Sequence, residues 1–272
     1  MRTFSVKNIC AAIAVPFIAM YVMPVQAQTE YDLYIAGTKV TSTNCGDLSV
    51  INGVTGKATY TPATKTLILE NATINGGEEN GITSNTEGLT IKIAGTNNII
   101  SDEYTALQVD KSATITGGGV LNLQAESSSA LYVRITDLTI DNCTVNAKGL
   151  YGIAGINGTY DEKVTIRNAD VTAEGTKKGS VCDLAGLILE GCNITQPAGA
   201  KFDAEIHAVV LDGEKVKSKV VITKDPTSID SPNADAVAAK GIYTLQGVGL
   251  QGTFESLPKG VYIVNGKKII KK

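Results

Sequence analysis

The sequence predicts an all-β fold, a right-handed parallel β-helix of about six coils followed by a small C-terminal β-hairpin module. Short apolar triplets recur at intervals of 22 to 26 residues and occupy residues 67–69, 89–91, 113–115, 138–140, 164–166 and 187–189. The first and third residues of each triplet are apolar and the middle one is usually Thr, which is the pattern of a strand with one buried face. Repeats of about 20 to 50 residues are typical of solenoids.

Two further rows of strand residues recur between the triplets. One row pairs a small residue with an aliphatic residue, at 81–82, 106–107, 130–131, 152–153 and 180–181. The other row is an aliphatic residue after each triplet: Ile74, Ile99, Val120, Val145, Val171 and Ile194. Three strand rows in each repeat predict a coil with three faces.

The bends that follow the triplets carry residues that tolerate a left-handed backbone. Asn or Gly lies four residues after the start of a triplet at Asn71, Gly117, Asn142, Asn168 and Gly191. Such residues are typical of sharp corners. A leucine-rich repeat would need a fixed Leu and Asn spacing that this chain lacks, and a propeller blade needs about 40 residues. A parallel β-helix is the repeat fold that remains.

Both flanks of the repeats supply candidate caps, which a solenoid needs to cover its open backbone edges. In front of the coils, residues 31–40 predict a strand and residues 59–63 predict a turn into the coil strand 66–70. Behind the coils, Asp212-Gly213 is a hairpin signal between two apolar segments. Residues 28–225 are therefore expected to form the β-helix with its two caps.

The composition changes after Asp225. Residues 226–240 begin with a stretch rich in Pro, Ser and Asp, which predicts a linker. Residues 241–272 are expected to form a small β module, because two alternating segments are followed by Asn265-Gly266, a pair typical of two-residue hairpin turns.

Residues 1–27 have the features of a secretory signal peptide. Arg2 and Lys7 precede an apolar stretch at 9–23, and small residues lie just before the expected cleavage at Gln28. The stretch is shorter than the roughly 20 residues that span a bilayer, and a membrane anchor is the alternative. The mature protein is expected to be secreted or on the cell surface, with no membrane span after cleavage.

The charge balance argues against a nucleic-acid binder. The chain has 24 Lys and Arg against 27 Asp and Glu, a net charge of -3, and a nucleic-acid binder normally carries a basic excess.

The single His, His207, rules out metal sites built from several imidazoles and is expected at an exposed strand position. Four cysteines after residue 27 are too few for a disulfide framework, and Cys182 is expected to be an outward-facing free thiol.

Acidic residues are expected to gather at one corner of successive coils. They are Glu78, Glu79, Asp102, Glu103 and Glu126. Stacked carboxylates repel each other unless a cation intervenes, and calcium prefers several oxygen ligands. Calcium is therefore the candidate ion, and a solvated charged corner is the alternative.

Three tyrosines are candidates for binding a sugar. Tyr104 and Tyr151 are expected at the same corner of the coil as the acidic residues, and Tyr132 follows Leu131 on the outward phase. Aromatic faces bind sugar rings by apolar contact. The alternative is that these are ordinary tyrosines scattered on a β surface.

Two segments resemble known families. Residues 60–74 (YTPATKTLILENATI), which lead into the Leu-Thr-Ile coils, resemble exported β-helix proteins of Bacteroidetes-type bacteria that are often labelled hypothetical or carbohydrate-binding-like. This likeness covers most of residues 31–225. Residues 257–264 (LPKGVYIV) and 266–272 are similar to the end of C-terminal sorting domains of the type IX secretion pathway. The second likeness implies surface delivery and an export machinery as partner, and a plain β-hairpin tail is the alternative.

The β-helix resemblance also implies one enzyme class, because several proteins of this shape are pectate-type lyases. Such enzymes use acidic residues to hold calcium against an acidic sugar and a Lys or Arg to take the proton. After residue 27 the arginines are Arg134 and Arg167, and nothing in the sequence places either beside a carboxylate cluster. The expected function is therefore non-enzymatic, glycan-binding or adhesive, with a glycan or a surface protein as partner. A structural envelope component is the alternative, and a calcium-dependent polysaccharide lyase is less favoured.

Overall fold

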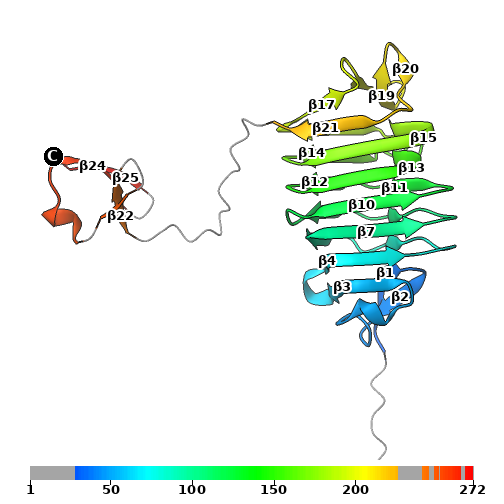
Figure 1. The fold of residues 1–272 in the computed structure, drawn as a ribbon, viewed down its shortest axis with the longest axis horizontal. Coiled ribbons are helices and arrows are strands. Elements are labelled where there is room, and N and C mark those ends of the chain that lie inside the picture. Colours follow the sequence, from blue (N-terminus) through cyan, green and yellow to red (C-terminus); the bar gives the residue numbers. More distant parts are fainter. Residues whose placement is uncertain (1–27, 226–240, 245–247, 251, 265–266, 272) are drawn as a thin grey trace, which may run out of the picture.

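A computed structural model describes residues 28–225, 241–244, 248–250, 252–264 and 267–271 (Figure 1). The fold is all-β, as predicted, with a parallel β-solenoid of about five turns and a separate small antiparallel sheet. The solenoid has about one turn fewer than the sequence predicted. The expected signal peptide, 1–27, and the expected linker, 226–240, lie outside the described residues.

The solenoid has three faces, which we name A, B and C in the order that the chain visits them. Face A contains the apolar triplets, in β4 (Thr66–Asn75), β6 (Leu89–Ala94), β9 (Ala113–Thr116), β12 (Leu138–Asp141), β14 (Lys163–Arg167) and β16 (Gly186–Glu190). Face B contains the end of β4, then β7 (Thr96–Ser101), β10 (Val120–Ala125) and the first halves of β13 (Thr144–Ala154) and β15 (Asp170–Cys182). Face C contains β5 (Ile82–Ser84), β8 (Leu107–Val109), β11 (Ser129–Val133) and the ends of β13 and β15.

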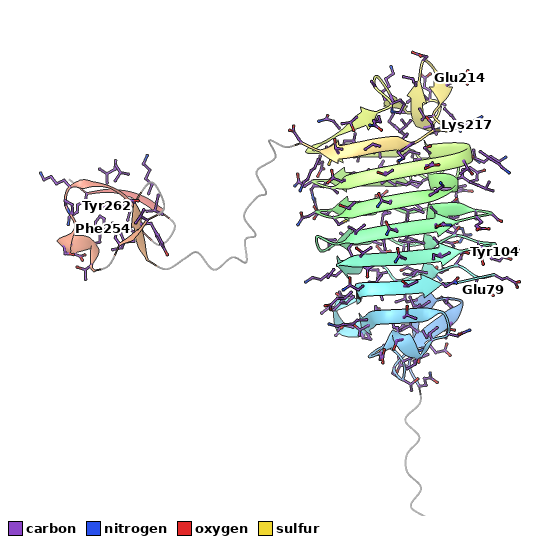
Figure 2. All side chains as sticks on the ribbon, viewed as in Figure 1. Glu79, Tyr104, Glu214, Lys217, Phe254 and Tyr262 are labelled. Carbon is purple, nitrogen blue, oxygen red and sulfur yellow. The ribbon has the colours of Figure 1, made fainter. Side chains whose placement is uncertain are left out.

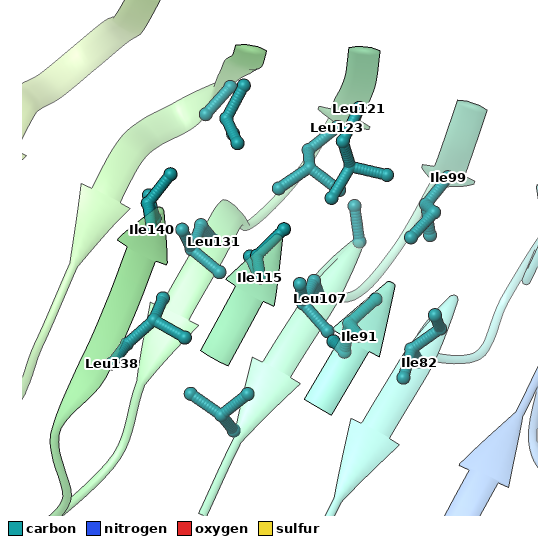
Figure 3. Packing of buried hydrophobic residues seen from close by; sticks show 14 of the residues in the cluster. Ile82, Ile91, Ile99, Leu107, Ile115, Leu121, Leu123, Leu131, Leu138 and Ile140 are labelled. Carbon is teal, nitrogen blue, oxygen red and sulfur yellow. The ribbon is translucent and has the colours of Figure 1, made fainter. Parts of the chain in front are cut away.

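The predicted stacking of aliphatic side chains is confirmed in the interior. Ile91 is in register with Ile115, and Ile115 with Ile140. All three are fully buried, and Figure 3 shows them in a cluster with residues of the opposite faces such as Leu131. The small-aliphatic row also stacks as predicted, through Ile82, Leu107, Leu131, Ile153 and Val181.

Two register predictions were wrong. Leu67 pairs with Ile91 instead of Leu89, because the alternating strand continues to Ile93 and a shift of two residues keeps the apolar side chains inward. Val120 is only partly buried, whereas Leu121 is fully buried and pairs with Val145. Adjacent aliphatic residues leave the phase of a strand ambiguous, and here the period of two extends through Leu121 and Leu123.

The corners between faces A and B confirm the role predicted for Asn and Gly. Asn71, Asn142 and Asn168 have φ angles of 50°, 49° and 45°, and Gly117 and Gly191 also have positive φ. A Cβ atom on Gly117 would lie 2.5 Å from the carbonyl oxygen of Ile93. These corners therefore need residues that adopt a left-handed backbone.

The N-terminal cap is a hairpin where one strand was expected. β1 (Glu30–Ile35) and β2 (Thr38–Thr41) pair around Ala36 and Gly37, which both have positive φ. β1 pairs antiparallel with β5, and β3 (Val54–Thr61) pairs antiparallel with β4. The 3-10 helices η1 (Leu48–Val50) and η2 (Pro62–Thr64) flank β3, and η2 supplies the predicted turn into β4.

The C-terminal cap closes over faces B and C. β21 (Val220–Lys224) lies antiparallel between β15 and β17 (Cys192–Gln196). β19 (Ala208–Leu211) pairs with β15, with β18 (Lys201–Asp203) and with β20 (Glu214–Lys215). Leu211 pairs with Glu214, so the two-residue hairpin predicted at Asp212-Gly213 is confirmed.

The C-terminal module is a four-stranded antiparallel sheet and not a single hairpin. Its strands, in the order β23 (Gly249–Leu250), β22 (Ile242–Thr244), β24 (Gly260–Val264) and β25 (Lys267–Lys271), accompany the 3-10 helix η3 (Phe254–Ser256). Figure 2 shows Tyr262 beside Phe254, and their ring centroids are 6.0 Å apart. Val264 pairs with Lys267, and the turn predicted at Asn265-Gly266 lies outside the described residues. Among the helices of the described residues, none has the length and apolarity needed to cross a membrane.

Candidate functional site

A groove of about 450 Å³ on face C contains all three tyrosines that the sequence singled out. Its lining comes from β8, β11 and β13 and from the turns beside the five strands, from Asn80 before β5 to Asp183 after β15. The volume is in the range of small-ligand sites. Tyr104 is 56% exposed and projects at the same edge of the solenoid as Glu79 (Figure 2).

Tyr132 and Tyr151 are positioned by packing on a cluster outside the main interior. Tyr132 follows the buried Leu131 and therefore points outward, in register with Ala154 of the next strand. Both rings pack against the buried residues Ala154, Cys182 and Ala208. Burial raises the pKa of both phenols above its usual value, so the hydroxyls stay protonated at neutral pH and can donate hydrogen bonds.

Amide side chains form a connected polar wall at one end of the groove. Asn80 donates from Nδ2 to Thr83 Oγ1 at 2.9 Å and accepts the Thr105 N–H at 2.9 Å. Gln108 donates from Nε2 to the two carboxylate oxygens of Asp110 at 2.9 and 3.1 Å. These bonds fix both amides in a single orientation beside Tyr104 and Tyr132.

Asp183 is the charged side chain among the described residues that line the groove. Its Oδ1 lies 2.9 Å from Lys215 Nζ, in an ion pair with an 18% exposed carboxylate. The thiol of Cys182 donates to its Oδ2 at 3.6 Å. The negative charge is therefore offset by a cation that does not itself line the groove.

Glu162 builds the far wall of the groove, and the sequence analysis missed it. The fully buried Glu162 accepts the N–H of Ile156 and of Gly158 on Oε1, at 2.8 and 3.0 Å, and the N–H of Tyr160 on Oε2 at 2.9 Å. Position 155 needs glycine, because a Cβ atom there would lie 2.4 Å from the Asp183 carbonyl oxygen. The signal was the interval of 26 residues between the triplets at 138 and 164, the longest of the series, which indicates an enlarged turn.

His207 packs beside this wall and is not the exposed strand residue that was expected. It lies in a turn with a φ of 57°, and its Nδ1 is 3.2 Å from the Leu184 carbonyl oxygen. The side chain is half-buried, and a Cβ on Gly158 would fall 2.1 Å from the same nitrogen. The ring therefore fills space behind the wall.

The five acidic residues share a corner, but their side chains spread into solvent. The corner stacks through backbone bonds, with the Asp102 N–H donating to the Gly77 carbonyl at 2.9 Å and the Ser127 N–H to the Asp102 carbonyl at 3.1 Å. Glu78, Glu79, Asp102, Glu103 and Glu126 are all exposed, and none of them lines the groove. Within the part of the chain that the structure describes, no three His, Cys, Asp or Glu side chains form a group that could hold a metal ion.

Arg134 and Arg167 both form ion pairs on the outer surface. Arg167 donates from Nε and Nη2 to the two oxygens of Asp141, each at 3.1 Å. Arg134 lies 3.6 Å from Asp110. Neither arginine is among the groove-lining residues.

The four cysteines of the described residues, Cys45, Cys143, Cys182 and Cys192, are free thiols, but Cys182 is buried and not exposed as its outward phase suggested. β19 covers it, because Ala208 pairs directly with Cys182. Burial raises the pKa of the Cys182 and Cys143 thiols to about 12 and raises the pKa of Cys192 as well. Cys45 is the half-buried member of the set.

In the folded protein at pH 8 we expect only Cys45, among these four thiols, to react readily with DTNB. A thiol with a pKa of about 12 is ionised at pH 8 in about one molecule in 10,000. The reactivity of Cys143 and Cys182 should rise as the pH approaches 12. The measurement is the absorbance of released thionitrobenzoate before and after denaturation in guanidinium chloride. Rapid reaction of the folded Cys45→Ser variant would contradict the burial of the other three thiols.

The groove offers aromatic faces, fixed amides and hydroxyls, and one neutralised carboxylate. Such a lining suits non-covalent recognition of a polar, ring-containing ligand. Comparison of the chain with protein-family models, with curated proteins and with solved structures finds no match.

Proposed function

We propose that this protein is an exported, non-enzymatic β-solenoid that binds glycan through the groove on face C. One observation carries the proposal: Tyr104, Tyr132 and Tyr151, from three successive coils, line a single groove together with amide and hydroxyl side chains. Aromatic faces and fixed polar groups are the two elements of sugar recognition. Binding without catalysis is supported by the lining, whose one carboxylate is held by Lys215.

The proposed location is the cell surface or the surrounding medium. The signal-peptide features of residues 1–27 and the likeness of the C-terminal residues to a type IX sorting domain support export. The export machinery is then a second proposed partner, through the C-terminal sheet. A glycan or surface protein bound on face C would make the solenoid an adhesive element of the envelope.

Replacing Tyr132 by Ala is expected to lower glycan affinity at least tenfold, because its ring lines the groove from the middle one of the three coils that carry tyrosines. Tyr132→Phe keeps the packing on Ala154 and loses the hydroxyl, so we expect a smaller loss of about three- to tenfold. Glycan-array screening would identify the ligand, and isothermal titration calorimetry would measure both variants. A protein that binds no glycan on the array would contradict the proposal and favour a purely structural envelope component.

A further inference from the structure

We infer that the groove selects neutral, linear oligosaccharides of at least three rings that lie along the solenoid axis. This inference rests on the glycan-binding function proposed above and adds the length and charge of the ligand. It follows from the position of each tyrosine in the stack, from the free hydroxyls and from the charge of the lining.

The three tyrosines lie on successive coils but not at one position along the strands, because Tyr151 is in register with Ser129 and Tyr132 lies three residues further along that strand. Tyr104 precedes β8, Tyr132 lies in β11 and Tyr151 lies in β13, so each successive coil contributes one ring. Neighbouring strands are about 4.8 Å apart, which is close to the length of one pyranose ring in an extended chain. Tyr104 and Tyr151 lie two coils apart near the start of face C, and Tyr132 lies further along the strand of the coil between them. A single sugar ring cannot reach all three tyrosines, whereas a chain of three or more rings along the axis can lie between them.

The whole groove extends over more coils than the three that carry the tyrosines. Its lining extends from Asn80, before β5, to Asp183, after β15. Four steps between five strands span about 19 Å. This length corresponds to about four rings, so affinity is expected to rise with chain length and then level off.

The tyrosine hydroxyls are available to a ligand. Among the described residues, none accepts from or donates to the hydroxyl groups of Tyr104, Tyr132 or Tyr151. The Gln108 amide donates to Asp110 instead of to a tyrosine hydroxyl, and this bond holds the amide in place beside the tyrosines. Sugar hydroxyls both donate and accept hydrogen bonds, so they can pair with these free phenol groups.

The charge of the groove favours a neutral chain over an acidic one. No Lys, Arg or His is among the described lining residues, and Asp183 supplies a carboxylate. Lys215 is bound to that carboxylate at 2.9 Å and is not free to hold a second anion. The exposed acidic corner of Glu78, Glu79 and Asp102 lies beside the Tyr104 edge and would repel a polyuronate.

Calorimetric titration of the purified protein with chains of one to six rings tests the inference. The probes are cello-, malto- and manno-oligosaccharides, with oligogalacturonates of equal length as the acidic series. In at least one neutral series we expect affinity to increase about tenfold or more from two to four rings and then to level off. Oligogalacturonates should bind at least about tenfold more weakly at equal length.

Variants at Tyr104 and Tyr151, on the outer two of the three coils that carry tyrosines, test whether these rings cause the increase in affinity with chain length. Tyr104→Ala and Tyr151→Ala should each remove most of the gain between two and four rings. Ile188→Ala is the control, because Ile188 is also exposed, lies on face A and does not line the groove. It should leave the length dependence unchanged.

The outcomes separate this inference from the function on which it rests. Binding of neutral sugars that does not depend on length, or tighter binding of oligogalacturonates, would overturn the inference and leave glycan binding intact. Failure of all neutral and acidic chains to bind would overturn both.

Discussion

Replacing Ile115 by Ala is expected to lower the free energy of unfolding of the solenoid by about 2–5 kcal/mol. Ile115 is fully buried and lies between Ile91 and Ile140 in the stack of face A. Each coil of a solenoid is supported mainly by the coil on either side. A cavity at Ile115 therefore weakens two interfaces at once, and the paired strands on both sides limit any collapse into the space. The measurement is urea-induced unfolding followed by circular dichroism.

Thr114→Ala is the matched control for this substitution. Thr114 is adjacent on the same strand, points outward and is only partly buried. Its replacement is expected to change the free energy of unfolding by about 0.5 kcal/mol or less. Equal destabilisation by the two variants would contradict the assignment of Ile115 to the interior.

The interior could be predicted from the sequence because the solenoid repeats one arrangement. A period of two identifies the inward residue of each strand, and the same alignment of the coils predicts that Tyr104, Tyr132 and Tyr151 lie near one another. The translation from coil to coil then carries each position onto the next. The approach failed at Val120, where Leu121 is adjacent and equally apolar, so the pattern does not specify which residue points inward.

The remainder of the site depends on structure that does not repeat. The wall of residues 155–157 belongs to the turn between β13 and β14, and the conformation of this turn depends on the side chain of Glu162. The burial of Cys182 depends on β19, which is distant in sequence. At the acidic corner the backbone stacks as predicted, but this stacking does not bring the carboxylates together, because long exposed side chains are free to separate.

Replacing Glu162 by Ala is expected to lower the free energy of unfolding by about 2–4 kcal/mol and to loosen the wall of the groove. The substitution leaves the amides of Ile156 and Tyr160 without their acceptor, and the Gly158 N–H keeps only its bond to the Asp183 carbonyl oxygen at 2.9 Å. Hydrogen exchange measured by mass spectrometry should show faster exchange in residues 156–160. Glycan affinity should fall in parallel, because Ile156 lines the groove.

Two further variants separate the role of the Glu162 carboxylate from a general effect of substitution in this turn. Glu162→Gln keeps one acceptor oxygen but places an amide donor against the N–H groups of the turn, so we expect an intermediate loss of protection. Asp161→Asn is the control, because the Asp161 carboxylate is 82% exposed and pairs only with Lys163 at the surface. It should leave both exchange and affinity unchanged. Unaltered exchange of residues 156–160 in Glu162→Ala would show that the turn keeps its shape without the carboxylate, and the groove wall would then need another explanation.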